Sequence, residues 1–577
     1  MFTFVELQTI YSQTIPVKSA EQQQDFCNIH LTSPDNLKFT PTERDLLCGE
    51  SQSPSWRDLP PSQKSFFLRG FLQSRGYLMP TFRQDGADLF VQTGPMAKLQ
   101  TFTVTNAPER MAWQKRRHLV GRELNPPLLK DAVTWSRRRL QMRGHPCAEA
   151  EGQVVIERES INVHVQPGPF SQFSPYETVG ETDIPLATLD RYTAFTEGDE
   201  FDVRLLELTS NRILREDLYL SAFFDIRCEP GKPPKIVRRL IPADRKLLSF
   251  GIGADSQEGP LVRASWKVTR LSDRANSFET SIFASLRQQS IETKYHHHIS
   301  NDLKSRLQVI PSFQLKREEE SNYETRSSQL GLALAYGWEE RTYLPRVQIG
   351  PLIERSETLR GTGPTRLDSL RILSEVTATS HLYEYYMQDP QEGWTATLNL
   401  SSQFESVVSE ETFHKLSFRH QKIWNLGEWD PPFLILSWRS TMGTFVAQSA
   451  RRATDQIPVN QRFFLGGDSD LRGFGRKSLP QSTEGFLSSV YNGFELRTGR
   501  WFALNLQPFL LWDFAWTGDQ PSTLDGSFFH SPGIGLRYPS PIGTLRATVA
   551  RGYVRPADGQ TAPTARDQFF FSFGKEF

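Results

Sequence analysis

The part of the sequence from about residue 246 to the last residue consists of segments in which apolar and polar residues alternate. Clear examples are Leu261–Val268 (LVRASWKV), Leu330–Tyr336 (LGLALAY) and Thr544–Ala550 (TLRATVA). Hydrophilic stretches rich in Gly, Pro, Asp and Glu separate these segments. Alternating strands of about ten residues, joined by loops of uneven length, are typical of transmembrane β-barrels. The same pattern predicts strands at Phe278–Leu286, Thr395–Leu400, Phe433–Trp438 and Phe569–Phe573.

The length of this region predicts the number of strands. About 330 residues follow position 245, and about 20 residues per strand with its share of turn allow about sixteen antiparallel strands. We expect the first strand near Leu247–Gly253 and the last at Phe569–Phe577. A soluble β-propeller would also alternate, but the sequence shows no blade-length repeat. The fold predicted for this region is therefore an all-β transmembrane barrel.

Bulk composition agrees with a barrel and argues against two other classes. The sequence contains no run of 18 apolar residues, so it does not predict a transmembrane helix. A mean hydropathy of −0.47 is compatible with a barrel, because alternating strands average to a soluble-looking value. The formal net charge is zero, from 66 Lys and Arg against 66 Asp and Glu, which argues against nucleic-acid binding. The 40 Phe residues suit the aromatic girdles of a barrel.

The first 245 residues contain an internal repeat. Val91–Pro95 (VQTGP) aligns with Val165–Pro169 (VQPGP), so residue 91 corresponds to residue 165 at a period of 74. A period of this length indicates repeated small domains. An amphipathic helix ending in glycine precedes each copy, at Ser65–Gly76 and at Leu129–Gly144, and glycine just past a helix is a stop signal. Strands are expected after the second helix, at Val154–Ile156 and Ile161–Val165.

A third copy is indicated by a helix at Val203–Tyr219 and a strand at Phe223–Ile226. We therefore expect three α+β modules in front of the barrel. The expected boundaries are residues 24–95, 96–168 and 169–243 for the modules, 246–577 for the barrel, and an unassigned segment at 1–23.

The N-terminal residues and the cysteines bear on the cellular compartment. Residues 1–20 lack a basic start and a continuous apolar core, so they do not predict a typical secretory signal, although a bacterial membrane barrel must be exported. Cys27 and Cys48 are close enough in the sequence for a disulfide between them to close a short loop, and an oxidising compartment would allow this bond. The sequence alone leaves both the bonded and the free form open. Cys147 and Cys228 fall in different expected modules, which disfavours a bond between them.

Residues 462–480 (RFFLGGDSDLRGFGRKSLP) carry the most distinctive motif of the chain. Clustered Gly, Asp and Ser also occur in ordinary solvated turns. This motif alone therefore does not decide between an ordinary solvated turn and a loop with a specific function. Three segments follow it in order: YNGFELRTGR around Glu495, FLLWDFAWTGD around Asp513, and GIGLRYPSPIGTLRATVA at 533–550. The sequence then ends in FFFSFGKEF. The central motif residues are Gly466, Gly467, Asp468, Leu471, Arg472, Gly473 and Phe474.

Together these segments resemble the BamA/TamA superfamily of outer-membrane assembly barrels, and the layout is most similar to the TamA type. The resemblance implies three periplasmic α+β modules called POTRA domains, followed by a sixteen-stranded barrel. It also implies that the loop bearing Arg472 folds back into the barrel lumen and pairs with Asp513 and Glu495 on the wall. The alternative is that these two carboxylates simply line a watery lumen. Leu511 and Ala515 depart from the family pattern, which often has an aromatic residue and a glycine at these positions.

The resemblance further implies a function in outer-membrane biogenesis. The first strand meets the last at a weak seam that acts as a lateral gate, where a client strand adds to the open edge. The implied partners are a TamB-like inner-membrane-anchored protein bound through the POTRA domains, unfolded outer-membrane protein clients and outer-membrane lipid. No cofactor is implied. The last-strand residues expected at this gate are Phe571, Phe573, Gly574 and Phe577.

Several alternatives remain open at this stage. A two-partner secretion pore usually has two POTRA domains and a plug helix, for which residues 1–20 are available. A BamA-like general insertase normally has more POTRA domains, and a passive porin explains neither the repeats nor the arginine loop. Ser469 lies in GGDSDLRG, which lacks the second glycine of a nucleophile elbow, so no enzyme is predicted. No Cys or His spacing predicts a metal site, and His296–His298 are expected at a loop or strand end.

Overall fold

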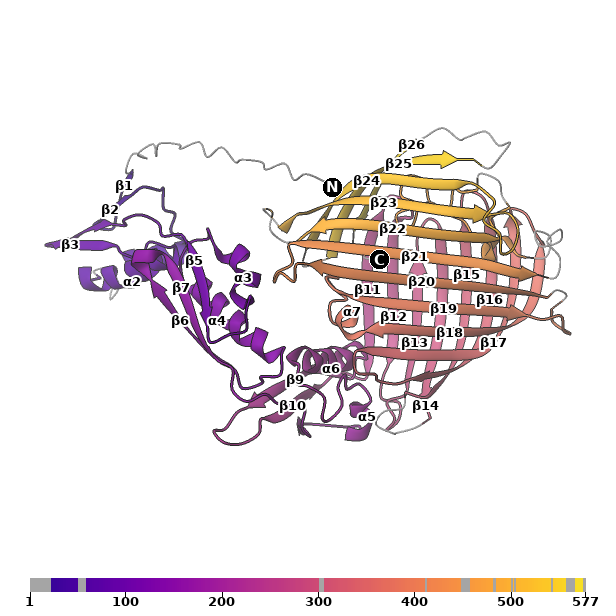
Figure 1. The fold of residues 1–577 in the computed structure, drawn as a ribbon, viewed down its shortest axis with the longest axis horizontal. Coiled ribbons are helices and arrows are strands. Elements are labelled where there is room, and N and C mark those ends of the chain that lie inside the picture. The colour runs from indigo at the N-terminus through magenta and orange to yellow at the C-terminus, as the bar shows by residue number, and fades with distance from the viewer. Residues whose placement is uncertain are drawn as a thin grey trace, which may run out of the picture. The chain divides into compact units, whose positions relative to one another are not determined.

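The computed structural model describes residues 22–49, 59–299, 306–409, 412–447, 457–480, 484–499, 502, 505–540, 543–556 and 566–573. The chain divides into two compact units. One unit comprises the residues up to Arg138 together with Glu149–Pro167, and the other comprises Arg139–Ala148 together with the residues from Gly168 onwards. None of the described helices is long and apolar enough to cross a membrane. Figure 1 labels the elements of both units.

The first α+β module is a four-stranded sheet with two helices. Its strands lie in the order β1 (Gln22–Phe26), β2 (Ile29–Ser33), β4 (Asp88–Gln92) and β3 (Thr81–Asp85). Helices α1 (Pro41–Cys48) and α2 (Pro61–Ser74) connect β2 to β3. Strand β2 is parallel to β4, and the other neighbours are antiparallel. Strand β1 already includes Gln22 and Gln23, which the sequence left in the unassigned segment.

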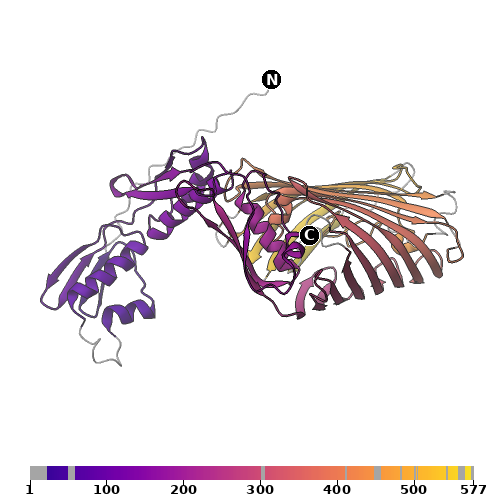
Figure 2. The ribbon, with the colours of Figure 1, turned by 90° about the horizontal axis from the view of Figure 1, so that it is seen from below.

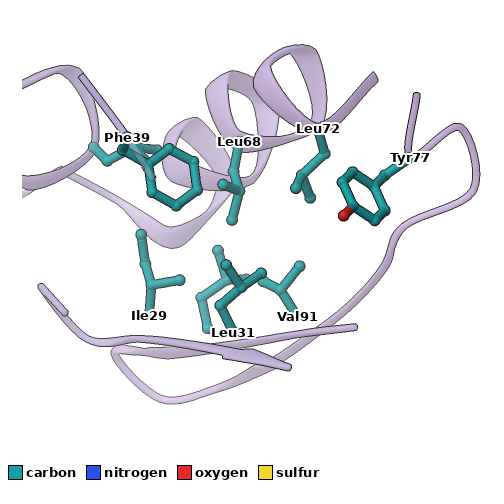
Figure 3. Close-up of a cluster of buried hydrophobic side chains, with 9 residues drawn as sticks. Ile29, Leu31, Phe39, Leu68, Leu72, Tyr77 and Val91 are labelled. Carbon is teal, nitrogen blue, oxygen red and sulfur yellow. The ribbon is translucent and has the colours of Figure 1, made fainter. Parts of the chain in front are cut away.

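The core of this module forms where one face of α2 meets the sheet. Leu68 and Leu72 are four residues apart, so they lie on the same face of the helix, and both point toward Leu31 and its neighbours on the sheet (Figure 3). Tyr77 closes one end of the core, and its hydroxyl donates to Asp35 Oδ2 at 2.6 Å. Burial raises the pKa of Tyr77 to about 12, so the phenol stays protonated and keeps this hydrogen bond.

The second and third modules repeat this connectivity. In each, the first strand is parallel to the last, and the middle strand is antiparallel to the last. The order strand, helix, helix, strand, strand therefore occurs three times, and the prediction of three α+β POTRA-like modules before the barrel is confirmed. The second module contains β5 (Thr101–Thr105), α3 (Met111–Leu119), α4 (Pro126–Gln141), β6 (Glu149–Val155) and β7 (Ser160–Gln166). The third contains β8 (Glu177–Gly180), α5 (Leu186–Asp190), α6 (Val203–Arg215), β9 (Tyr219–Arg227) and β10 (Lys235–Pro242).

The sequence repeat maps to equivalent places in the first two modules. Its Val-Gln pair ends β4 in one module and β7 in the other. The glycine that follows has a positive φ in both, 70° at Gly94 and 69° at Gly168, a conformation that favours glycine. In the third module the expected helix Val203–Tyr219 ends earlier, at Arg215. Asp217 turns the chain through a left-handed φ of 57°, so Tyr219 begins the next strand instead.

Two disulfides join segments that are distant in the sequence. Cys27, in the turn between β1 and β2, is bonded to Cys48 at the end of α1. Cys147 is bonded to Cys228, with Cα atoms 5.8 Å apart, which corrects the expectation from the sequence. The reason is that residues 139–148 pack with the third module. The backbone N–H of Gly144, for example, donates to Phe201 O at 3.0 Å.

Sixteen antiparallel strands then close a barrel, as predicted. Figure 2 shows these strands lying side by side. A short helix, α7 (His381–Tyr385), lies between β18 and β19. The strands are β11 (Lys246–Asp255), β12 (Gly259–Val268), β13 (Ser277–Ala284), β14 (Gln288–His298), β15 (Gln308–Glu319), β16 (Glu324–Gly337), β17 (Tyr343–Arg360), β18 (Arg366–Ser380), β19 (Gly393–Gln403), β20 (Phe413–Leu426), β21 (Leu434–Ala447), β22 (Ser488–Thr498), β23 (Gln507–Gly518), β24 (Phe528–Ser540), β25 (Gly543–Arg555) and β26 (Arg566–Phe573).

Alternation along each strand separates the outer face of the barrel from its lumen. On β23, Leu510 and Trp512 are exposed by 60% and 58%, whereas the neighbouring Leu511 and Asp513 are buried. Successive side chains of a strand point to opposite faces, so the exposed apolar row faces outwards and the buried row faces the lumen. A lumenal row that contains a fully buried carboxylate requires a partner for it inside the barrel.

The third module is fixed to the end of the barrel at which β11 begins. Arg212 on α6 is 4% exposed and is paired with two carboxylates of the barrel turns. Its Nη2 lies 2.6 Å from Glu384 Oε2 on α7, and its Nη1 lies 2.9 Å from Glu339 Oε2 between β16 and β17. Tyr385 on α7 donates to Glu207 Oε2 on α6 at 2.6 Å. These bonds hold α6 against the turns of the barrel.

We expect the first disulfide to contribute strongly to the stability of the first module. The bonded cysteines are 21 residues apart, and closing a loop of this size stabilises a fold by about 3 kcal/mol. The double variant Cys27→Ser/Cys48→Ser should lower the free energy of unfolding of this module by that amount, measured by urea-dependent proteolysis. The matched variant Cys147→Ser/Cys228→Ser should leave the first module unchanged. Alkylation of Cys27 and Cys48 without prior reduction would contradict the assignment.

Candidate functional site

The motif found in the sequence lies between β21 and β22, in a segment described at residues 457–480 and 484–487. Its central residues are held inside the barrel and not in solvent. Leu471 and Arg472 are both 0% exposed. The strands that surround Arg472 present their buried rows to it, Tyr491 and Glu495 on β22 and Asp513 on β23. The segment is called the lumenal loop below.

Arg472 is bonded to two carboxylates on the barrel wall. Its Nε donates to Asp513 Oδ2 and its Nη2 to Asp513 Oδ1, both at 2.8 Å. Its Nη1 donates to Glu495 Oε2 at 2.7 Å. The backbone N–H of Arg472 also donates to Asp513 Oδ2, at 3.2 Å. A planar guanidinium suits this arrangement, because it satisfies one carboxylate through two bonds and a second through another nitrogen.

Two further wall residues complete the cluster, and neither was identified from the sequence. Arg546 on β25 donates from Nη2 to Glu495 Oε2 at 2.6 Å. Tyr491 on β22 donates from its hydroxyl to Asp513 Oδ1 at 3.1 Å. The group, called the ionic cluster below, thus holds two arginines and two carboxylates and is neutral overall. A neutral, hydrogen-bonded set is the form in which charges are tolerated inside a protein.

Glycines allow the lumenal loop to approach the wall closely. A Cβ placed on Gly473 would lie 2.4 Å from the Cα of Gly552 on β25, so the two backbones are in contact and both positions need glycine. Gly466 has a φ of 107°, and a Cβ there would lie 2.2 Å from Gly475 O. Gly552 was not identified from the sequence. The contact joins two segments that are distant in the sequence, so the local sequence around either glycine does not predict it.

An apolar cluster supports the ionic cluster from one side. Leu471 packs in it with wall residues that include Ala515 and Phe529, and Phe474 meets the Phe529 ring edge-on at 5.7 Å between centroids. Ala515, which departs from the family pattern, is fully buried here. Leu511, the other departure, packs in a separate cluster on β23 and β25.

Asp468 and Asp470 have different roles within the loop. Asp470 Oδ1 accepts from the backbone N–H groups of Gly466 and Leu471 at 2.7 Å and 2.6 Å. It therefore shapes the turn that presents Arg472. Asp468, which the sequence placed in the motif, makes none of the contacts of the ionic cluster. Gly467, which precedes Asp468, has a φ of 125°, a conformation that favours glycine.

The barrel closes at a seam between its first strand, β11, and its last strand, β26, which the structure describes as far as Phe573. Every residue of β11 from Lys246 to Asp255 is in register with β12. Within the described residues, only Ala254 and Asp255 are in register with β26, opposite Phe573 and Ser572. Phe571 and Phe573, two of the predicted gate residues, lie on this strand, whereas Gly574 and Phe577 lie outside the described residues.

The histidine run does not form a metal site in the part of the chain that the structure describes. His296–His298 lie at the end of β14, where the backbone N–H of His298 donates to Asn276 Oδ1 at 2.9 Å. No group of three or more His, Cys, Asp or Glu among the described residues is placed to hold a metal ion.

We expect the Arg472 and Asp513 substitutions to be non-additive. Arg472→Ala and Asp513→Ala should each favour opening of the lumenal loop by about 3–5 kcal/mol, because each leaves a buried charge without its partner. The double variant should cost less than the sum. Native-state proteolysis between residues 457 and 480 measures this opening. Arg555→Ala, an exposed position on β25, is the control with little effect expected, and additive effects at 472 and 513 would contradict their direct contact.

Comparison with known proteins places these features in context. A family model described as the Omp85 superfamily domain matches residues 263–577, more than half of the chain. The fold is similar to BamA from Haemophilus ducreyi lacking POTRA domains 1–3, at 14% identity and a TM-score of 0.49, covering 82% of this chain and 98% of that one. It is also similar to CdiB from Acinetobacter baumannii, at 13% identity and a TM-score of 0.45, covering 83% and 90%. CdiB from Escherichia coli gives 13% identity and 0.45, covering 91% and 99%.

Proposed function

The chain belongs to the Omp85 superfamily of outer-membrane β-barrels, and from this premise we propose that it is an assembly and translocation factor of the TamA type. In this proposal it helps insert or secrete outer-membrane proteins, such as autotransporters and other barrels. The client strand enters through a lateral gate between β11 and β26. The three modules, which we assign as POTRA domains at residues 24–95, 96–168 and 169–243, lie in the periplasm.

The observation that carries this proposal is the way in which the barrel closes. Each other pair of neighbouring barrel strands is consecutive in the chain, whereas β11 and β26 are its first and last strands and meet without a connecting turn. Because no turn links these two strands, they can separate without straining a connection, and each then presents backbone N–H and C=O groups to a further strand. Adding a client strand to such an edge satisfies these groups.

The modules offer a second set of strand edges for a partner. In the third module the sheet order is β8, β10, β9, so β8 is an edge strand, and Val179 on it is exposed. An extended segment of another protein can add to an edge of this kind. We assign this role to a TamB-like protein anchored in the inner membrane, with outer-membrane lipid as a second substrate of the assembly.

Locking the seam should abolish client assembly. The pair Ala254→Cys/Phe573→Cys places two thiols at positions in register across the seam, in a chain whose own four cysteines are all bonded. Oxidation should reduce insertion of an autotransporter barrel into proteoliposomes by at least about tenfold, and a reductant should restore it. The control pair Val262→Cys/Ala284→Cys joins two strands that stay paired and should keep full activity. Full activity with the seam oxidised would refute the gate.

A partner should be found at the module edges and not at the far end of the barrel. A photo-crosslinking residue at Val179 should capture a long, β-rich, inner-membrane-anchored protein in cells, identified by mass spectrometry. The same residue at Val407, in the exposed turn between β19 and β20, should not capture it. Capture of one dedicated secreted client at Val179 would instead favour a two-partner secretion pore.

A further inference from the structure

The lumenal loop continues from the ionic cluster toward the last strand of the barrel. Gly473 touches Gly552 on β25, as described above. Two residues later, a Cβ placed on Gly475 would lie 3.9 Å from Gln568 Oε1 on β26. The short segment Arg472–Gly475 therefore lies against the inner face of the strands that lead to the seam.

The next residue of the loop is held by the other side of the seam. Arg476 Nη1 donates to Glu258 Oε1 at 2.6 Å, and Glu258 lies in the turn that joins β11 to β12. Its Nε donates to Glu320 Oε1 at 2.9 Å, just after β15. Both carboxylates are buried, with 6% and 2% of their side chains exposed. Salt in solution therefore screens these pairs little.

The neighbouring Lys477 lies at the turn that holds the second partner of Arg476, with its Nζ 3.6 Å from Glu320 Oε1. It donates to Glu318, at the end of β15, and to Tyr323 Oη at 2.7 Å. Asn322 Nδ2 donates to the backbone oxygen of Lys477 at 3.0 Å. These contacts fix the loop to the turn between β15 and β16, which does not border the seam. Both cations therefore hold the turn between β15 and β16, and Arg476 also holds the turn between β11 and β12.

The turn held by Arg476 is the same turn that closes the seam. The backbone N–H of Ser256 donates to Phe571 O at 2.9 Å, and the backbone N–H of Phe571 donates to Ser256 Oγ at 3.0 Å. Asp255 Oδ1 accepts from the backbone N–H groups of Gln257 and Glu258 at 2.6 Å and 2.9 Å. These bonds connect Glu258, which Arg476 holds, to the residues of the turn that contact β26.

We propose that residues Arg472–Arg476 form a strap across the inner face of the seam, with Arg476 as the positioning residue that ties the last strands to the first hairpin. The strap restrains from the lumen a junction whose two strands are not linked by a turn. Withdrawal of Arg476 removes a cation from two buried carboxylates, Glu258 and Glu320, so movement of the loop is coupled to opening of the seam. This inference rests on the proposed function for the meaning of the opening, and it adds the element that controls it.

Amide hydrogen exchange of the full chain in lipid nanodiscs tests the strap. The readout is the exchange rate in peptides that contain Ala254–Ser256 and Phe569–Phe573. Arg476→Gln and Glu258→Gln should each accelerate exchange at the seam about tenfold, equivalent to about 1.4 kcal/mol. The double variant should exchange no faster than the faster single variant. Arg476→Lys keeps the charge and should restore part of the protection.

Lys477→Gln is the matched control, because it removes the adjacent cation of the same loop without touching the seam hairpin. It should leave seam exchange unchanged. Unchanged exchange in both Arg476→Gln and Glu258→Gln would overturn the strap, and so would equal acceleration by Lys477→Gln. The readout requires no client or partner. The strap is therefore tested separately from the gate, whose own failure would appear as full assembly activity with an oxidised seam.

Discussion

The buried charge of Arg472 is the constraint on which the rest of the lumen depends. An arginine with no exposed surface is tolerated only when carboxylates neutralise it and take its hydrogen bonds. Asp513 and Glu495 do both, and Arg546 balances the remaining negative charge. This neutral set forces the lumenal loop to lie inside the barrel and against its wall. The contact of Gly473 with Gly552 follows from that approach, since a side chain at either position would push the loop away.

The ionic cluster and the seam are two parts of one arrangement. Sixteen strands close the barrel, and its first strand, β11, meets its last strand, β26, without a connecting turn. The lumenal loop is firmly anchored on β22 and β23, and four residues beyond Arg472 it reaches the β11–β12 turn through Arg476. A loop that contacts both sides of this junction can hold it closed. The Arg212 contacts fix the third module to the turns at the end of the barrel where β11 begins.

The sequence predicts the strands and modules of this protein better than it predicts the contacts between distant residues. Alternation predicted the barrel strands because burial on one face imposes a period of two, and a period of 74 revealed the modules. The segments around Arg472, Glu495 and Asp513 were recognised through resemblance. Arg546, Gly552 and Glu258 were not found, because their contacts depend on strand register and barrel closure, which alternation does not encode. The Cys147–Cys228 bond was missed because residues 139–148 pack with the module that follows them in the chain.

The most direct test of the account is a measurement of the Arg472 contacts in a membrane. Solid-state NMR on the full chain in lipid bilayers, with ¹⁵N-labelled arginine and ¹³C-labelled aspartate and glutamate, detects guanidinium nitrogens that lie within hydrogen-bond distance of carboxylate carbons. The account predicts a contact between Arg472 and Asp513 that is present in the unmodified chain and lost in Arg472→Lys or Asp513→Asn. A spectrum in which the Arg472 guanidinium has no carboxylate contact, with the barrel folded, would contradict it.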